Sequence, residues 1–502
     1  MVEPVFEKIN YNQRVGEVKE QIKVEVKSNV RSEDVFSVLS VSPWVSVNES
    51  EVENAKLNYG GKIIFYISYL SVDGGIKKCE CGSEFAGSIK SDKIKDTCRT
   101  ITSAVVDKAE ADNQGAYLTV SAYLTVSAQL IDCNEVSALT GGEQLVVKEN
   151  QLNCIKSLGI KRGTYPIEEE FELSYPIEEV LFHRANGVIT AVQSGVGTII
   201  VDGEVLLSLV LLQKNDKNDI IRENRVVPFR MEIECEEAMP NMQATAKVRE
   251  RAFKTDISVD EESGKSVVNA SVTLSFEGEA FTSVCVTVAS DAFSTENEVE
   301  LQYENFPSYK ACDLRGYTEV INGKSTVNEL PVGATVLAVG GEKATVISTE
   351  CTDNGIVVAG VLSATAFMKD GDSKVFVRKL EVPFERTLDG AFNCDTLIEV
   401  VLKAERASAK IVSLTEVELE AEVFFTVYPV EKYENRIVKD IKVLGEKAKN
   451  TSAISVYIPE EGEELWSLSK RLNVCPEQLV NTNKELQFPL TGQERIVVYR
   501  RR

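Results

Sequence analysis

Histidine is nearly absent from this chain, because its 502 residues include only one, His183. With a single imidazole, a Ser-His-Asp relay, a two-histidine zinc site and a histidine proton shuttle all lack most of their usual parts. An enzyme with this sequence would have to use carboxylates, lysines or tyrosines, and no paired acids stand at a convincing spacing. The sequence therefore indicates a protein that is not an enzyme, with no catalytic residues, no cofactor and no metal site.

Positive charge is also scarce. Lys and Arg number 55 against 78 Asp and Glu, so the formal net charge is −23. A chain with this balance is repelled by phosphate backbones and by anionic membrane surfaces. The composition therefore argues against nucleic acid as a partner.

Long apolar runs are missing as well. The longest strongly apolar run, 205–212, falls far short of the roughly 20 residues that cross a bilayer. The first residues also lack the basic segment and apolar core that mark a protein for secretion. We therefore expect a cytoplasmic protein without direct membrane insertion.

Reactive residues that stand alone are expected to be structural. The 11 cysteines are an odd number without a Cys-x-x-Cys pair, which predicts reduced and mostly buried thiols. We interpret Cys79 and Cys81 as strand residues rather than half of a metal site, because no second thiolate pair accompanies them. His183 is expected to be an ordinary strand residue, and Trp44 a core anchor.

One unit recurs along most of the chain. A glycine opens an apolar strand, a turn follows about eleven residues later, and a second strand ends in an aromatic residue. The glycine and the aromatic residue are 24, 26 and 24 residues apart in three copies: Gly61 and Phe85, Gly203 and Phe229, Gly360 and Phe384. Each copy is followed by an alternating strand, around Ala122, Ala270 and Ala421. The unit therefore repeats about every 150 residues.

This pattern predicts a mainly β fold. Strands and turns alternate at short intervals without a long helical period, which is typical of antiparallel sandwiches. We therefore expect three β-sandwich-like repeats of about 150 residues, followed by a small α+β domain. The four predicted domains span 1–150, 151–305, 306–445 and 454–502.

Short sequence motifs predict the turns, short helices and linkers that connect the strands. Asn186-Gly187 and Gly340-Gly341 favour tight hairpins, because these residues tolerate a positive φ. Two stretches with weaker patterning, 91–109 and 238–251, are expected to hold short helices. Linkers are expected where the alternation lapses or charge dominates, at 149–161, 304–314 and 433–451.

The pattern changes in the last 49 residues, 454–502. A short strand leads to a turn at Gly462, and Leu465, Leu468 and Leu472 then recur at the spacing of one helix face. Pro476 suits the first turn of a second helix, and a strand closes the segment. The predicted order is strand, helix, helix, strand, or βααβ.

This segment resembles a LysM domain. The match rests on a Gly-x-x-Leu-Trp opening, an asparagine after the second helix, and a Gly-Gln turn before the last strand. The matching residues are Gly462, Leu465, Trp466, Leu468, Val474, Leu479, Asn483, Gly492, Gln493, Ile496 and Val498. Where the family has Asp-Thr, this chain has Glu463-Glu464.

The resemblance implies a binding groove formed by two loops of the LysM domain. In the family this groove takes N-acetylglucosamine chains. Carried over onto this sequence, the groove would be lined by Gly462, Glu463, Glu464, Leu465, Trp466, Asn483, Lys484, Glu485 and Leu486.

The whole chain resembles the SipL family of spore coat morphogenetic proteins, which combine SPOCS domains with one C-terminal LysM domain. Pro228-Phe229 and Pro383-Phe384 are the clearest shared marks of the SPOCS domains, and Glu84-Phe85 is a departure. The resemblance implies a role in sporulation in the mother-cell cytoplasm, at the forespore surface. The LysM domain would bind the SpoIVA-like coat ATPase, and the repeats would recruit or space other coat proteins.

Three classes of function remain open. The first is a non-enzymatic scaffold for spore coat assembly, which accounts for the charge and for the Glu463-Glu464 replacement. The second is a cell-wall protein that binds peptidoglycan or N-acetylglucosamine, and affinity for such oligomers separates the two. The third is a carboxylate-based enzyme within one repeat, which a ligand in a deep pocket would favour.

Overall fold

The computed structural model describes residues 2–214, 219–260, 265–352, 355–390, 396–448 and 452–500. The chain is mainly β, as predicted, and its strands form several small antiparallel sheets. Three successive sets of strands, which we call sheet pairs A, B and C, make up all but one of these sheets. Among the described residues, no helix has the length and apolar character needed to cross a membrane.

Sheet pair A contains the first six strands. One sheet has the order β2-β3-β4 and the other β1-β6-β5. A single 3-10 turn, Ser32–Asp34, separates the first two strands. The strands are β1 (Glu3–Arg31), β2 (Val35–Glu53), β3 (Lys56–Ser71), β4 (Ile76–Lys90), β5 (Cys98–Asp112) and β6 (Tyr117–Glu143).

Sheet pair B has the same arrangement in the next six strands. Its sheets have the orders β8-β9-β10 and β7-β12-β11. The strands are β7 (Val146–Leu173), β8 (Ile177–Ser194), β9 (Thr198–Gln213), β10 (Ile220–Glu234), β11 (Gln243–Val259) and β12 (Ser266–Phe293).

Sheet pair C differs in one respect, because its first long strand is divided in two. Both parts pair with β19, and β18 pairs with β19 on the other side; the second sheet has the order β15-β16-β17. The strands are β13 (Asn297–Ala311), β14 (Arg315–Thr326), β15 (Thr335–Thr352), β16 (Gly355–Lys369), β17 (Val375–Asp389), β18 (Leu397–Ile411) and β19 (Glu416–Glu446).

Apolar residues at alternate positions of the central long strands form the core of each sheet pair. Strand β6 carries the duplicated segment YLTVSA, and its apolar positions from Leu118 to Ala128 are completely buried. Because side chains of a strand alternate between its two faces, the even length of the duplicated unit keeps every apolar residue on the core side. Similar stretches, 268–276 of β12 and 417–427 of β19, fill the other two cores.

The recurring glycine and phenylalanine face each other across neighbouring strands. Gly61 pairs with Phe85, and the other two copies pair in the same way, Gly203 with Phe229 and Gly360 with Phe384. A Cβ atom added to any of the three glycines would lie within 2.6 Å of the ring. The aromatic ring thus covers a bare glycine, a known stabilising device in sheets.

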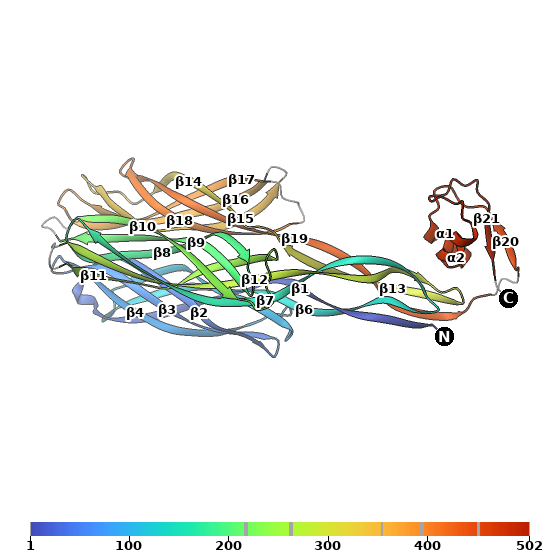
Figure 1. The fold of residues 1–502 in the computed structure, drawn as a ribbon. Coiled ribbons are helices and arrows are strands. Elements are labelled where there is room, and N and C mark those ends of the chain that lie inside the picture. Colours follow the sequence, from blue (N-terminus) through green and yellow to red (C-terminus); the bar gives the residue numbers. More distant parts are fainter. Residues whose placement is uncertain are drawn as a thin grey trace.

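Beyond the sheet pairs, the long strands continue as a narrow arm (Figure 1). The arm consists of three two-stranded ribbons: β1 with β6, β7 with β12, and β13 with β19. Apolar side chains from all three ribbons meet inside it, among them Ile9, Val136, Leu152, Val288 and Ile437. The arm is therefore a packed element with its own core.

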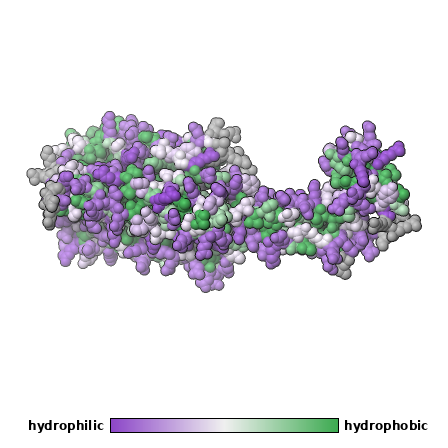
Figure 2. Space-filling model, in the orientation of Figure 1, coloured by the Kyte–Doolittle hydropathy of each residue, from purple (hydrophilic) through white to green (hydrophobic). Residues whose placement is uncertain are grey.

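The far end of the arm, which we call the arm tip, brings several chain ends together. The turn between β6 and β7, the turn between β12 and β13 and the end of β19 all lie there, as does the N-terminus (Figure 1). Apolar residues also reach the arm surface (Figure 2), including Val284, Val443 and Leu444, which are 41%, 46% and 56% exposed.

The last described segment folds as a separate small unit beside the arm tip, which we call the C-terminal module (452–500) (Figure 1). Its elements follow the predicted order: β20 (Ile454–Tyr457), α1 (Leu465–Leu472), α2 (Pro476–Thr482) and β21 (Ile496–Tyr499). Pro476 occupies the first turn of α2, as expected. Leu468, Leu472, Leu479 and Ile496 are at the centre of its core.

Several local predictions are wrong. Residues 98–109 lie in β5 and 243–251 in β11, where helices were expected. Asn186-Gly187 lies within β8, and Gly340-Gly341 lies within β15 at an irregularity of the strand pairing. Neighbouring strands pair with most residues of these segments, and this pairing overrides weak local signals.

The stretches expected to be linkers are mostly strand. Residues 149–161 lie in β7, 304–311 in β13 and 433–446 in β19, while 449–451 fall outside the described residues. Apolar and polar residues alternate less regularly there because these segments belong to the arm. Only part of each two-stranded ribbon contacts the small core of the arm. The chain turns instead at 144–145 and 294–296.

Replacing Gly360 by Ala tests the glycine–aromatic pair. The new Cβ would lie 2.6 Å from both the Phe384 ring and the carbonyl oxygen of Thr345, so we expect a loss of about 1–3 kcal/mol in the free energy of unfolding. Thermal melting followed by circular dichroism measures it. Gly316→Ala is the control, because no atom lies within 4 Å of its added Cβ; equal losses in both variants would contradict this explanation.

Candidate functional site

The C-terminal module contacts the arm tip through one face of α1. Trp466, Lys470 and Asn473 are spaced at i, i+4 and i+7, which places them on one side of the helix and its C-cap. All three contact the segment Asp291–Thr295, which ends β12 and forms the turn to β13. We call this the docking contact.

Trp466 contributes both a hydrogen bond and a ring contact to the docking contact. Its indole Nε1–H donates a hydrogen bond of 2.8 Å to Oδ2 of Asp291. The ring stands edge-on to the ring of Phe293, with centroids 5.3 Å apart, a favourable geometry for aromatic pairs. Trp466 is half-buried, because Asp291 and Phe293 of the same chain cover part of its ring.

Two polar side chains complete the docking contact. The Lys470 ammonium lies 2.7 and 2.8 Å from the two carboxylate oxygens of Asp291. The Asn473 amide donates a 2.5 Å hydrogen bond to the carbonyl oxygen of Thr295. Lys447, just after β19, donates to the Asn473 side-chain oxygen and to the carbonyl oxygen of Ser294, both at 2.8 Å.

Asp291 is held in its charged form by these partners. Partial burial opposes ionisation, but the hydrogen bonds from Lys470 and Trp466 outweigh it, and the pKa of Asp291 is lowered from its ordinary value of 3.8. The docking contact therefore carries a carboxylate at neutral pH.

A groove of about 450 Å³ runs beside the docking contact, between the arm and α1. Its walls are mostly apolar and aromatic, with one glutamate and two lysines among the lining residues. The lining residues are Ala292, Phe293, Glu298, Val299, Leu301, Tyr303, Leu444, Lys447 and Lys470.

The first predicted groove loop is largely structural. Gly462 has a φ of +80° and its N–H donates to the carbonyl oxygen of Leu490. The Glu463 carboxylate accepts hydrogen bonds from Arg471, which lower the pKa of this glutamate. Glu464 is exposed at the start of α1, and Leu465 lines a shallow groove with α2.

The second predicted loop is divided between structural and exposed residues. The Asn483 amide donates to the carbonyl oxygens of Leu479 and Val497 and accepts from the N–H of Val497, so it ties α2 to β21. Leu486 is half-buried against the module core. Lys484 and Glu485 are exposed.

The residues of the predicted LysM groove therefore do not form one binding site. Trp466 faces the arm tip, Glu463 and Asn483 maintain the fold of the module, and Lys484 and Glu485 lie open to solvent. Sequence reasoning missed Lys470, Asn473 and Asp291. The helical spacing of the first two residues was visible in the sequence, but nothing local linked them to a carboxylate 179 residues away.

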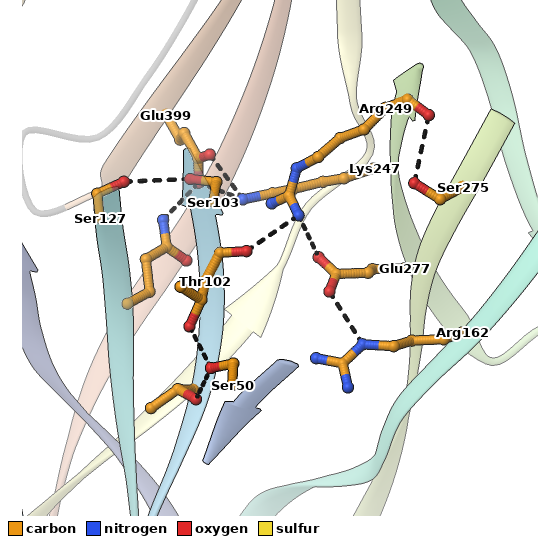
Figure 3. A network of polar contacts seen from close by, with 12 residues as sticks. Ser50, Thr102, Ser103, Ser127, Arg162, Lys247, Arg249, Ser275, Glu277 and Glu399 are labelled. Atoms are coloured by element: carbon orange, nitrogen blue, oxygen red, sulfur yellow. Dashed lines mark hydrogen bonds and ion pairs between the residues drawn. The ribbon is translucent and has the colours of Figure 1, made fainter. Parts of the chain in front are cut away.

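A polar network at the base of the arm joins the three sheet pairs (Figure 3). The Lys247 ammonium of pair B lies 2.6 and 2.7 Å from the carboxylate of Glu399 in pair C. The same carboxylate accepts a hydrogen bond from Gln129 of pair A. Arg249 of pair B donates to the carbonyl oxygen of Thr102 in pair A. This junction brings polar side chains from all three sheet pairs into one network.

A second polar cluster lies buried between pairs B and C. Arg222 of β10 bonds to the carboxylate of Glu342 and to the carbonyl oxygens of Val339 and Ala407. Asn186 donates a 2.6 Å hydrogen bond to Glu405. Burial and the nearby Glu342 raise the pKa of Glu405 to about 8.

The isolated reactive residues are mostly structural. His183 is a buried strand residue, as expected, and burial lowers its pKa to about 4. Trp44 packs against the core of sheet pair B, although it comes from sheet pair A. The cysteines among the described residues are free, but only three of them are buried, so the expectation of mostly buried thiols is wrong.

The raised pKa of Glu405 makes stability depend on pH. The carboxyl is protonated more readily in the folded chain, so its contribution is full below about pH 4.5 and is lost as the pH rises toward 8. Glu405→Gln keeps an acceptor for Asn186 without the charge. We expect it to stabilise the protein by about 2 kcal/mol at pH 8 and hardly at all at pH 4.5.

Melting temperatures of both chains at the two pH values measure this effect. Glu420→Gln, at an exposed position of β19, is the matched control and should have no pH-dependent effect. A gain from Glu405→Gln that is equal at both pH values would rule out the titration of this group as the cause.

Removing the Asp291 carboxylate should release Trp466 to solvent. Trp466 is one of two tryptophans, so we expect Asp291→Ala to shift the fluorescence emission to longer wavelength. Because its pKa is lowered in the docked state, Asp291 should give the same shift in the unaltered protein as the pH falls below about 3.8. Glu300→Ala, at an exposed position of the same arm, serves as the control; no shift in Asp291→Ala would contradict the docking contact.

Comparisons with known proteins do not identify this chain. Neither family models nor curated proteins nor solved structures give a match.

Proposed function

We propose that this protein is a non-enzymatic scaffold of the spore coat, similar to the SipL family, and that its C-terminal module is a LysM domain that docks on a SpoIVA-like coat ATPase. The three sheet pairs would be SPOCS-like β-sandwich repeats that space or recruit other coat proteins. The setting would be the mother-cell cytoplasm at the forespore surface.

One observation supports this proposal above the others: the C-terminal module stands at the tip of a long packed arm, away from the sheet pairs (Figure 1). Such a form suits a spacer that holds one binding unit at a distance from others. The strand orders of the sheet pairs and the three glycine–aromatic pairs agree with a repeated unit.

The negative charge is distributed unevenly along the chain. Residues 454–502 carry seven basic and seven acidic side chains, so the net charge of −23 belongs to the preceding part of the chain. A neutral module can approach an acidic or a basic protein surface, whereas the sheet pairs favour basic partners. Lys484 and Glu485 are neighbouring exposed residues of the expected groove and are accessible for such a contact.

Retention of the full chain on two supports tests the proposal. Purified SpoIVA-like ATPase should retain the chain, and insoluble peptidoglycan should not. The paired exchange of Lys484→Glu with Glu485→Lys keeps the net charge and should weaken retention on the ATPase about tenfold, the effect of losing roughly 1.4 kcal/mol of binding energy.

The matched control exchanges two exposed neighbours in the turn between β4 and β5, Asp92→Lys with Lys93→Asp. It should bind like the unaltered chain. Retention on peptidoglycan alone would refute the scaffold and support a cell-wall protein instead.

A further inference from the structure

The docking contact has the form of a peptide bound to a recognition surface. Asp291 and Phe293 are two positions apart at the end of β12, so they share one side of an extended strand, and the carbonyl group of Thr295 lies in the turn that follows. Trp466, Lys470 and Asn473 share one side of a helix. One helix face thus contacts the end of a strand and the turn that follows it within the same chain.

Each residue on α1 contacts a different chemical feature of the segment. The Trp466 N–H and the Lys470 ammonium both bind the Asp291 carboxylate. The indole ring packs edge-on against an aromatic ring two residues later, at Phe293. The Asn473 amide donates to a backbone carbonyl group two residues further on, at Thr295. The surface therefore selects a carboxylate, an aromatic ring two residues later and a backbone carbonyl group just beyond them.

These interactions are individually weak. The Lys470 side chain is 44% exposed and that of Asp291 is 22% exposed, and ion pairs of this kind contribute only about 0–1 kcal/mol. The arm tip holds its place largely because it belongs to the same chain, which gives it a high effective concentration. A separate segment with the same chemistry can therefore compete for α1.

We propose that the face of α1 formed by Trp466, Lys470 and Asn473 is a recognition surface for an extended partner segment with an acidic residue followed two positions later by an aromatic one, and that the arm tip is its internal occupant. Binding of the partner segment displaces the arm tip and frees the module. This inference rests on the proposed role of the module in binding a partner protein.

A synthetic peptide with the sequence of residues 289–297, Ala-Ser-Asp-Ala-Phe-Ser-Thr-Glu-Asn, tests the proposal. Labelled with fluorescein, it is titrated with the full chain while its anisotropy is measured. Asp291→Ala weakens the internal occupant, so this variant should bind the peptide at least about tenfold more tightly than the unaltered chain.

Two controls make the readout specific. A peptide with Asn in place of its Asp should bind the Asp291→Ala chain at least about tenfold more weakly, because the ion pair with Lys470 is lost. Adding Lys470→Ala to the Asp291→Ala chain should have the same effect; Lys470 is exposed, so this change leaves the core of the module intact.

Three results would contradict the proposed recognition surface. Equal binding of the peptide to the unaltered chain and to Asp291→Ala, or binding that is insensitive to Lys470→Ala, would overturn the proposal. Absence of peptide binding to either chain would also overturn it. No coat protein takes part in this experiment, so its failure is distinguishable from failure of the proposed coat function.

Discussion

The pairing of the long strands is the interaction on which the rest of the structure depends. β6, β12 and β19 each run from a sheet-pair core into the arm. In β6, Leu118 to Leu130 fill the core of sheet pair A, and Val136 and Ala138, at the same parity, enter the arm core. One strand face therefore serves two cores, and the same long strands connect the arm to the sheet pairs.

Polar contacts decide how the three sheet pairs fit together. The Arg222–Glu342 pair lies between sheet pairs B and C and is almost completely removed from solvent, whereas the Lys247–Glu399 pair between the same sheet pairs is partly exposed. Burying such charges costs free energy unless their geometry is satisfied, so a misaligned arrangement would leave them unpaired. This requirement favours one relative orientation of the pairs, and through it one position of the arm tip.

Much of the local structure could be predicted because it depends on short patterns. The duplicated YLTVSA segment and the recurring glycine–phenylalanine spacing both reflect period-two alternation and close strand contact, and both are visible without knowledge of the fold. Predictions failed where local chemistry was overridden by pairing. Asn186, expected in a hairpin, is instead buried in β8 with its amide donating to Glu405 of another sheet pair.

The C-terminal module shows most clearly which features could be predicted from the sequence and which could not. The sequence by itself determined the order of its two strands and two helices, because helical spacing and a proline at a helix start act over a few residues. Only the tertiary structure decided that Trp466 faces Asp291 rather than an open groove. That contact joins residues far apart in the chain, and its existence depends on the alignment of three ribbons that no local pattern encodes.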